Sequence, residues 1–337
     1  MIWSTVGAIL AGLVPTLMIK DTLNTSLYLK VAIIFGILFG FAAVVTFIGT
    51  WEKVKPPVKT KLRDSFSEAS SVLRSRSFKI FIGIYLSGQC AMDFVSGMAI
   101  YYVDDVLGGY DKGYLTMLMG VLLSSQLVGM IIFTPIMTRT SKRTTILIGA
   151  PIRLASTVGL LAFSYAGAPI VPVLLLSAGV GIGNAATLTS IFAILADMAD
   201  IDELITSTRR PGIVSGMATF ARKISAGLSV WFIGLLLSLV GYDTKLAHSG
   251  VSQALTTQRG IAMIFIVIPA ILVVLLLIFG YIFPITNKEF DIVKKEIGRR
   301  RGTDNSTITD DEKRILERVT GFKYEDLWNV SNEHKVK

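Results

Sequence analysis

Long, nearly uninterrupted apolar stretches alternate with short polar segments along this 337-residue chain. Each stretch has roughly 17–25 residues, the length at which a helix crosses a bilayer core. The stretches lack the two-residue alternation of a membrane barrel, and lipid offers backbone groups no water, so we expect helices. About eight spans are predicted, at residues 2–19, 28–50, 78–103, 113–137, 145–166, 169–195, 212–240 and 260–283.

The composition also indicates a membrane protein. Hydrophobic residues make up 52% and charged residues 17%, against roughly 45–50% and about 25% in soluble domains. One cysteine and two histidines exclude a disulfide framework and leave no cluster with metal-ligand spacing. The N-terminus lacks the charged region and cleavage site of a signal peptide, so residue 1 is expected to begin inside a span. The predicted fold class is an all-α, polytopic membrane bundle without cofactor or metal.

Basic residues gather in alternate loops. Segment 51–79 carries eight cations against three acids, and the loop 138–144 and the tail after 284 are also basic. Segment 104–111 holds three aspartates and no cation. By the positive-inside rule, the basic loops and both ends of the chain face the cytoplasm, which places the protein in the cell (inner) membrane. Anionic lipid headgroups explain the net charge of +9 without nucleic acid, and we expect a monomer.

Two segments lie outside the spans. In 51–77, Pro56-Pro57 precede an amphipathic stretch that predicts a linker helix at the membrane surface. The tail, 284–337, is polar, and Thr309 is expected to cap a short amphipathic helix within "DDEKRILERVTGFKYEDLW". The tail is interpreted either as a docking or partly disordered appendage or as a partner-binding element.

Ionisable residues inside spans are costly, so each is a functional hypothesis. Tyr85, Gln89, Asp93 and Ser96 recur at helical spacing and form one polar stripe. Asp93 lies about 22 Å and Lys223 about 16 Å from the cytoplasmic ends of their spans. The depths differ by roughly the length of a lysine side chain, which allows an Asp93–Lys223 contact.

Two interpretations of these groups stay open. Both could line a water-filled cavity that binds a polar solute or couples an ion. Alternatively, they join two helices by a salt bridge, or Lys223 reaches the interface. We assign Lys223 to the cavity, whereas the two interpretations are balanced for Asp93. The candidate cavity residues are Lys223, Asp93, Gln89, Tyr85, Gln126 and Asn184. Arg222 points about 100° away from Lys223, and Arg153 is expected to anchor its span at the interface.

Three further patterns in the spans bear on function. Gln126 and Asn184 could contact the solute, although interhelical hydrogen bonds are the preferred role. "SAGVGIGNAA" at 177–186 is not a dinucleotide loop, because no βαβ unit surrounds it. Its small residues instead predict close helix packing. No Ser-His-Asp arrangement or G-x-S-x-G motif supports an enzyme.

The segment 195–212, "LADMADIDELITSTRRPG", concentrates charge between two spans. Charge pairs there could form in one state of an alternating transporter and break in the other. The alternative is a solvated charged loop. The charged residues are Asp197, Asp200, Asp202, Glu203, Arg209 and Arg210.

Together with the later "FARK", this segment resembles the signature of the glycoside–pentoside–hexuronide:cation symporter family, the melibiose-permease-like branch of the major facilitator superfamily. Asp197, Asp200, Glu203, Arg209 and Lys223 fall on the charged positions of that signature. The stretches "RTSKRTTILIG" and "FPITNKEFDIVKKEI" are also similar to family features, and the resemblance covers roughly residues 1 to 300.

The resemblance implies twelve helices in two six-helix halves joined by a cytoplasmic loop. Residues 1–50 would then be the last two helices of the first half-bundle, 51–77 the loop, 78–283 the second half-bundle and 284–337 a cytoplasmic tail. The first four helices would be missing, and the resemblance then implies that the chain would be a fragment, a truncated gene model or a degenerate transporter.

The resemblance also assigns roles. Lys223 would reach the solute and cation site, and Asp197, Asp200, Glu203 and Arg209 would be cytoplasmic gating charges. Leu188 stands where sugar-transporting members can carry a tryptophan, which weakens the argument for a glycoside. The expected function is Na⁺- or H⁺-coupled symport of a small solute, a sugar or uronide. The alternatives are a transporter of lysolipid-like amphiphiles and a non-transporting membrane scaffold.

Overall fold

The computed structural model describes residues 7, 25–50, 70–109, 113–248 and 252–328. The chain divides into two compact units, Met1–Ser65 and Phe66–Lys337. The described part of the first unit is chiefly α2 (Thr25–Gly49), a uniformly apolar helix. The predicted span 2–19 and most of the predicted linker helix lie outside the described residues.

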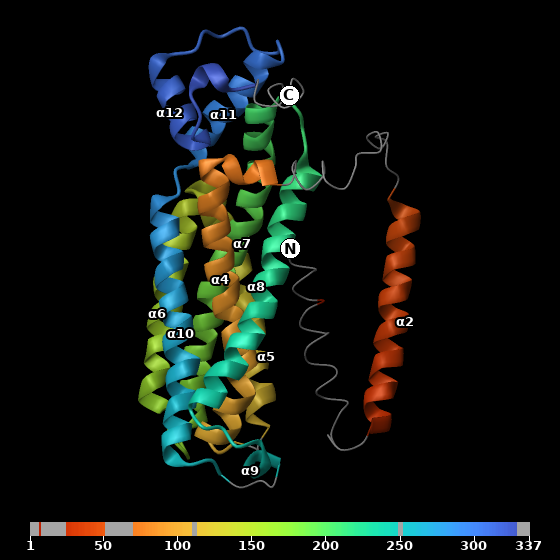
Figure 1. The fold of residues 1–337 in the computed structure, drawn as a ribbon, viewed down its shortest axis with the longest axis vertical. Coiled ribbons are helices and arrows are strands. Elements are labelled where there is room, and N and C mark those ends of the chain that lie inside the picture. Colours follow the sequence, from red (N-terminus) through yellow and green to blue (C-terminus); the bar gives the residue numbers. More distant parts are fainter. Residues whose placement is uncertain (1–6, 8–24, 51–69, 110–112, 249–251, 329–337) are drawn as a thin grey trace. The chain divides into compact units, whose positions relative to one another are not determined.

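The second unit is a bundle of long helices with a helical tail at one end (Figure 1). Short π and 3-10 turns, Tyr102–Val106 and Leu160–Phe163, extend two of the long helices, and α9 (Thr244–His248) lies between α8 and α10. The long helices are α4 (Arg76–Tyr101), α5 (Tyr114–Arg139), α6 (Lys142–Gly159), α7 (Ile170–Thr206), α8 (Pro211–Leu239) and α10 (Leu255–Ile282).

Among the described residues, seven helices are long and apolar enough to cross a membrane. They correspond to the seven predicted spans from 28–50 to 260–283. The chain is therefore an all-α, multi-pass membrane protein, because runs of this length must satisfy their backbone hydrogen bonds internally.

Helix α7 differs most from its predicted span. It continues past residue 195 to Thr206, a length of 37 residues, or about 55 Å. It ends at Ser207, whose φ of 58° is left-handed, and Pro211 opens α8 after a short connection. The acids from Asp197 to Glu203 consequently lie on helical turns rather than in a loop.

The glycine-rich stretch of α7 packs directly against neighbouring helices. A Cβ added to Gly183 would lie 2.6 Å from both the Arg153 backbone nitrogen and the Gly149 carbonyl oxygen of α6. A Cβ on Gly181 would lie 2.3 Å from the Leu122 carbonyl oxygen of α5. The prediction that these small residues allow close helix packing is confirmed.

The tail folds into α11 (Asn287–Arg300), α12 (Asp310–Thr320) and a 3-10 turn, Tyr324–Asp326. Thr309 and Glu312 form the capping box of α12, as the predicted cap requires, and Gly321 ends the helix at a φ of 82°. The helix is thus shorter than the quoted amphipathic stretch, because the left-handed glycine stops it.

The described tail docks on the bundle rather than extending from it. Leu316, Val319 and Leu327 are fully buried. The Ser77 hydroxyl of α4 donates a hydrogen bond to the Val319 carbonyl oxygen, at 2.5 Å. The Trp328 backbone N–H donates to the Leu204 carbonyl oxygen of α7, at 3.1 Å. We call this end of the bundle, where α11 and α12 lie (Figure 1), the tail end.

Candidate functional site

An ion pair joins α4 to α8 within the candidate membrane spans. Arg222 Nη1 and Nη2 each donate to a separate carboxylate oxygen of Asp93, both at 2.6 Å. The two side chains are 22% and 23% exposed. The planar guanidinium matches a carboxylate in two parallel hydrogen bonds, which a lysine ammonium cannot do.

The expected Asp93–Lys223 contact is therefore not formed, and Arg222 is the partner. Lys223 is exposed, and it forms no ion pair with any described residue. From the sequence, Arg222 and Lys223 of α8 both lie at a depth in the span that would allow contact with Asp93. Depth alone does not decide which of two adjacent side chains faces α4, because the side chains differ in direction by about 100°.

The other residues of the predicted polar stripe on α4 differ in how deeply they are buried. Tyr85 is buried, stacks on Phe81 with centroids 5.7 Å apart and interacts with the Arg222 charge. Gln89 is half-buried and Ser96 is exposed. The structure thus pairs Asp93 with a cation whose charge also acts on Tyr85, and it leaves Ser96 exposed.

Next to the ion pair, Cys90 of α4 meets Ser225 of α8, with Sγ and Oγ 2.5 Å apart. These two residues also line an apolar groove of about 610 Å³ that α10 completes. The α4–α8 contact therefore includes both an ion pair and part of an open apolar groove.

A second polar cluster lies in the bundle core. Arg153 Nη1 of α6 donates to the Gly88 carbonyl oxygen of α4, at 3.1 Å, and to Asn184 Oδ1 of α7, at 2.8 Å. Asn184 Nδ2 donates to Gln126 Oε1 of α5, at 2.7 Å. The interhelical hydrogen bonds expected of Gln126 and Asn184 are present, and the cluster connects four helices.

The expectation that Arg153 anchors its span at the interface is wrong. Its side chain is fully buried, and among the described residues its Nε and Nη2 have no hydrogen-bond partner. Gly149 and Gly183 bring α6 and α7 so close that the guanidinium extends between α4 and α7. The sequence analysis recognised Gly183 as part of a small-residue stretch, but it did not identify Gly149 or Arg153 of α6 as its neighbours.

The acids at the end of α7 each meet a cation. Arg210 makes two hydrogen bonds to the Asp202 carboxylate, at 2.8 and 2.9 Å. Asp200 and Arg209 are 3.9 Å apart at the surface. The remaining pairs, Asp197–Lys142 and Glu203–Arg301, join α7 to the start of α6 and to the end of α11 respectively.

Three of these acids, Asp197, Asp202 and Glu203, are buried. The alternative interpretation, a solvated charged loop, therefore fits only the Asp200–Arg209 pair. The sequence did not identify Lys142 and Arg301 as partners, because 55 and 98 residues separate them from their acids. The only signal was that the loop and tail holding these cations are basic and lie on the same predicted side.

A polar cavity of about 270 Å³ lies beside the Glu203–Arg301 pair. It is lined by Asp200, Glu203, Arg209, Lys294, Ile297, Gly298, Arg301 and Thr303. The described residues contain no group of three or more His, Cys, Asp and Glu side chains that could hold a metal.

Comparison with known proteins adds a family. A family model described as MFS/sugar transport protein matches residues 1–287. The glucuronide carrier protein homolog of Escherichia coli (strain K12) is 28% identical over 221 residues, which are 64% of this chain and 46% of that relative. A putative sulfoquinovose importer of Salmonella typhimurium is 24% identical over 320 residues, which are 94% of this chain and 66% of the relative.

An uncharacterized symporter of Synechocystis is 21% identical over 268 residues, covering 79% of this chain and 49% of the relative. The chain spans about half the length of the first and third of these relatives. The resemblance to the glycoside–pentoside–hexuronide:cation symporter family is thereby confirmed.

Proposed function

The chain belongs to the MFS/sugar transport protein family, and from this membership we propose that it acts in Na⁺- or H⁺-coupled symport of a sugar or uronide. Two relatives carry names that refer to glucuronides and to sulfoquinovose. Both solutes are sugars with an acid group, so an acidic sugar is the proposed class. Nothing in the fold or the comparisons favours the amphiphile transporter or the scaffold.

The exposed Lys223 beside the Asp93–Arg222 pair is the structural observation that supports this proposal. Arg222 is neutralised by its carboxylate, whereas Lys223 has no ion pair among the described residues. A cation at membrane depth is costly unless water or an anionic group reaches it. An acidic sugar would supply that group, and Asp93 would keep Arg222 from competing for it.

The charge pairs at the end of α7 are proposed to be the gate of the transport cycle. Asp197–Lys142 and Glu203–Arg301 join separate elements, so a relative movement of these elements would break them. Such pairs bias a rocking equilibrium between two states. The positive-inside rule supports a cytoplasmic location for this end of the bundle and for both ends of the chain.

Gradient-driven uptake tests the function. Vesicles carrying the chain should accumulate a radiolabelled glucuronide when a Na⁺ or H⁺ gradient is imposed, and collapse of the gradient should stop uptake. Lys223→Ala should abolish uptake while leaving insertion intact. Arg259→Ala is the matched control, because Arg259 is an exposed cation at the far end of α10. Absence of gradient-driven uptake for any acidic or neutral sugar would contradict the proposal, and uptake by Lys223→Ala would remove that residue from the site.

A further inference from the structure

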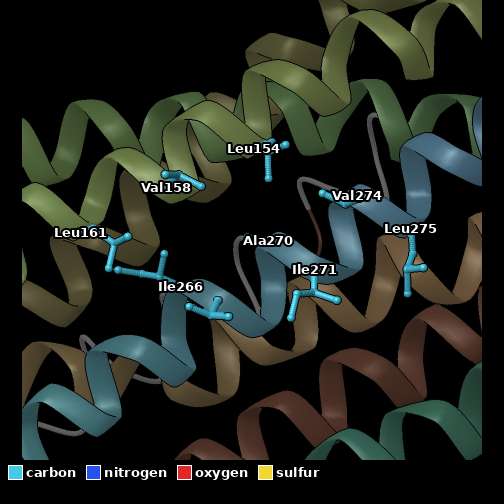
Figure 2. A pocket seen from close by; sticks show the side chains of 9 residues that line it. Leu154, Val158, Leu161, Ile266, Ala270, Ile271, Val274 and Leu275 are labelled. Atoms are coloured by element: carbon cyan, nitrogen blue, oxygen red, sulfur yellow. The ribbon is translucent and has the colours of Figure 1, made fainter.

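A second groove runs along the membrane-spanning surface between α6 and α10. It has a volume of about 370 Å³ and is lined by apolar side chains. Leu154 and Val158 of α6, with Leu161 of the 3-10 turn that follows it, face Ile266, Ala270 and Val274 of α10 across it (Figure 2). Val158 and Val274 are more than 40% exposed, so the groove is open along its side.

The same two helices carry a cation at their tail end. The Arg143 guanidinium, in the first turn of α6, lies 5.3 Å from the ring centroid of Tyr281 near the end of α10. No described carboxylate forms a salt bridge with Arg143. An arginine against an exposed tyrosine at the end of a span is the arrangement that membrane interfaces favour.

Two further cations lie nearby. Arg139 ends α5, and Lys288 follows Asn287, whose side-chain amide donates to the Thr140 carbonyl oxygen, at 2.8 Å. That bond ties the start of α11 to the α5–α6 turn. Neither Arg139 nor Lys288 forms an ion pair within the described ranges. Arg139, Arg143 and Lys288 together form what we call the basic corner.

The distances fit one lipid molecule. Val274 lies about 10 Å along α10 from Tyr281, and Leu154 about 16 Å along α6 from Arg143. One leaflet of the hydrocarbon core is about 15 Å deep. An acyl chain that begins below a headgroup at the basic corner would therefore enter the groove between these two residues.

We propose that the α6–α10 groove and the basic corner form a binding site for one anionic phospholipid. The phosphate is held by Arg143, with Arg139 and Lys288 adding positive charge, and one acyl chain lies in the groove over Ala270. These cations, which have no ion pair among the described residues, select an anionic headgroup over a zwitterionic one, because each basic residue near the surface attracts anionic lipid. This site uses neither Lys223 nor any residue of the pairs at the end of α7, although Arg143 adjoins Lys142.

Lipid binding can be measured without transport. The purified chain is titrated in detergent with phosphatidylglycerol or with phosphatidylcholine of the same acyl chains, and bound lipid is counted by native mass spectrometry. Phosphatidylglycerol should bind preferentially. Arg143→Gln, which removes the phosphate contact, and Ala270→Phe, which fills the groove, should each lower its binding several-fold. Glycerol 3-phosphate should not compete, because it lacks the acyl chain.

Two matched variants serve as controls. Arg259→Gln removes an exposed arginine from the opposite end of α10, and Ala155→Phe enlarges an exposed α6 residue outside the groove. Both should bind phosphatidylglycerol as the parent does. Val158→Trp fills the groove from its exposed wall and replaces Ala270→Phe if that variant does not elute as a folded protein. Equal binding of the two lipids, or unchanged binding in Arg143→Gln and in the groove-filling variants, would overturn the proposal.

Discussion

Arg222 and Lys223 are neighbours in the sequence but have opposite surroundings. Arg222 is held in two hydrogen bonds by Asp93, whereas Lys223 is exposed and has no ion pair in the described part of the chain. The sequence allowed a contact between Asp93 and Lys223. The structure does pair Asp93 of α4 with a cation of α8, but that cation is Arg222. Which of two adjacent side chains faces α4 depends on how α8 is rotated against it. The hydropathy of the sequence does not determine that rotation.

The Asp93–Arg222 pair should show strong energetic coupling. Asp93→Asn and Arg222→Gln each leave a partner partly buried and unpaired, so each should lower the free energy of unfolding by about 1–3 kcal/mol. The double variant should lose less than the sum of the two. Thermal unfolding of the four proteins in detergent measures this coupling. Additive losses would show that the two side chains do not act as a pair.

At the scale of elements, apolar length predicted the spans well and failed at the end of α7. The helix continues for about eleven residues beyond the predicted boundary. Its buried acids are paired with Lys142, Arg210 and Arg301, and this pairing offsets the cost of burying their charges. None of these pairings follows from a periodic pattern. The cap of α12 was predictable because Thr309 and Glu312 lie three residues apart, and that signal is local.

The glycines of α7 give a prediction for helix packing. Gly183→Ala places a Cβ against backbone atoms of α6 that cannot rotate away, so unfolding free energy should fall by about 1–3 kcal/mol. Gly216 of α8 has open space around it, and Gly216→Ala should raise stability by about 0.5–1 kcal/mol through helix propensity. The two melting temperatures in detergent should therefore move in opposite directions. Equal shifts would mean that α6 and α7 are not in close contact at Gly183.

The capping box of α12 gives a prediction for pH. Burial alone would raise the pKa of the Glu312 carboxyl, but hydrogen bonds from Arg299 and from the Thr309 backbone N–H lower it below its usual 4.5, and the Lys295 charge adds to this. A lowered pKa in the folded state stabilises the tail above the unfolded pKa. That stabilisation is lost as the pH falls below 4.5 through the folded value.

Trp328 can report this loss, because its backbone is bonded to α7. In a variant that retains only this tryptophan, its fluorescence should begin to change below pH 4.5. Glu312→Gln should show a smaller change, since the titrating group is gone, whereas Glu325→Gln should behave as the parent does. An identical pH profile for Glu312→Gln and the parent would assign the transition to other groups.

At the scale of the whole molecule, the second unit is a membrane bundle whose tail is part of its packing. Leu316, Val319 and Leu327 are buried, and the burial of each such side chain contributes about 1.5–3 kcal/mol. The sequence predicted a tail that either docks or stays partly disordered, and residues 284–328 dock. Composition could not decide this, because a polar segment with one apolar stripe is compatible with both outcomes.

The tail should accordingly stabilise the bundle. Val319→Asp places a carboxylate in a fully buried position beside α4, so it should detach the tail and lower the melting temperature of the bundle. Lys323→Asp introduces the same side chain at an exposed position and serves as the control. Limited trypsin digestion should cleave the tail of Val319→Asp faster than that of the control. Equal cleavage would show that the docked tail is not held by its apolar side chains.

The unbroken length of α7 has a mechanical consequence. Asn184, bonded to three neighbouring helices through its cluster, and Asp197 belong to the same rod and are about 20 Å apart along it. Pivoting this rod by about 10° at Asn184 displaces its acidic end by about 3 Å, enough to open a salt bridge. A movement of α7 at Asn184 would thus change the distances from its acids to Lys142 and Arg301 because the helix is rigid. No chain of side-chain rearrangements along α7 is needed.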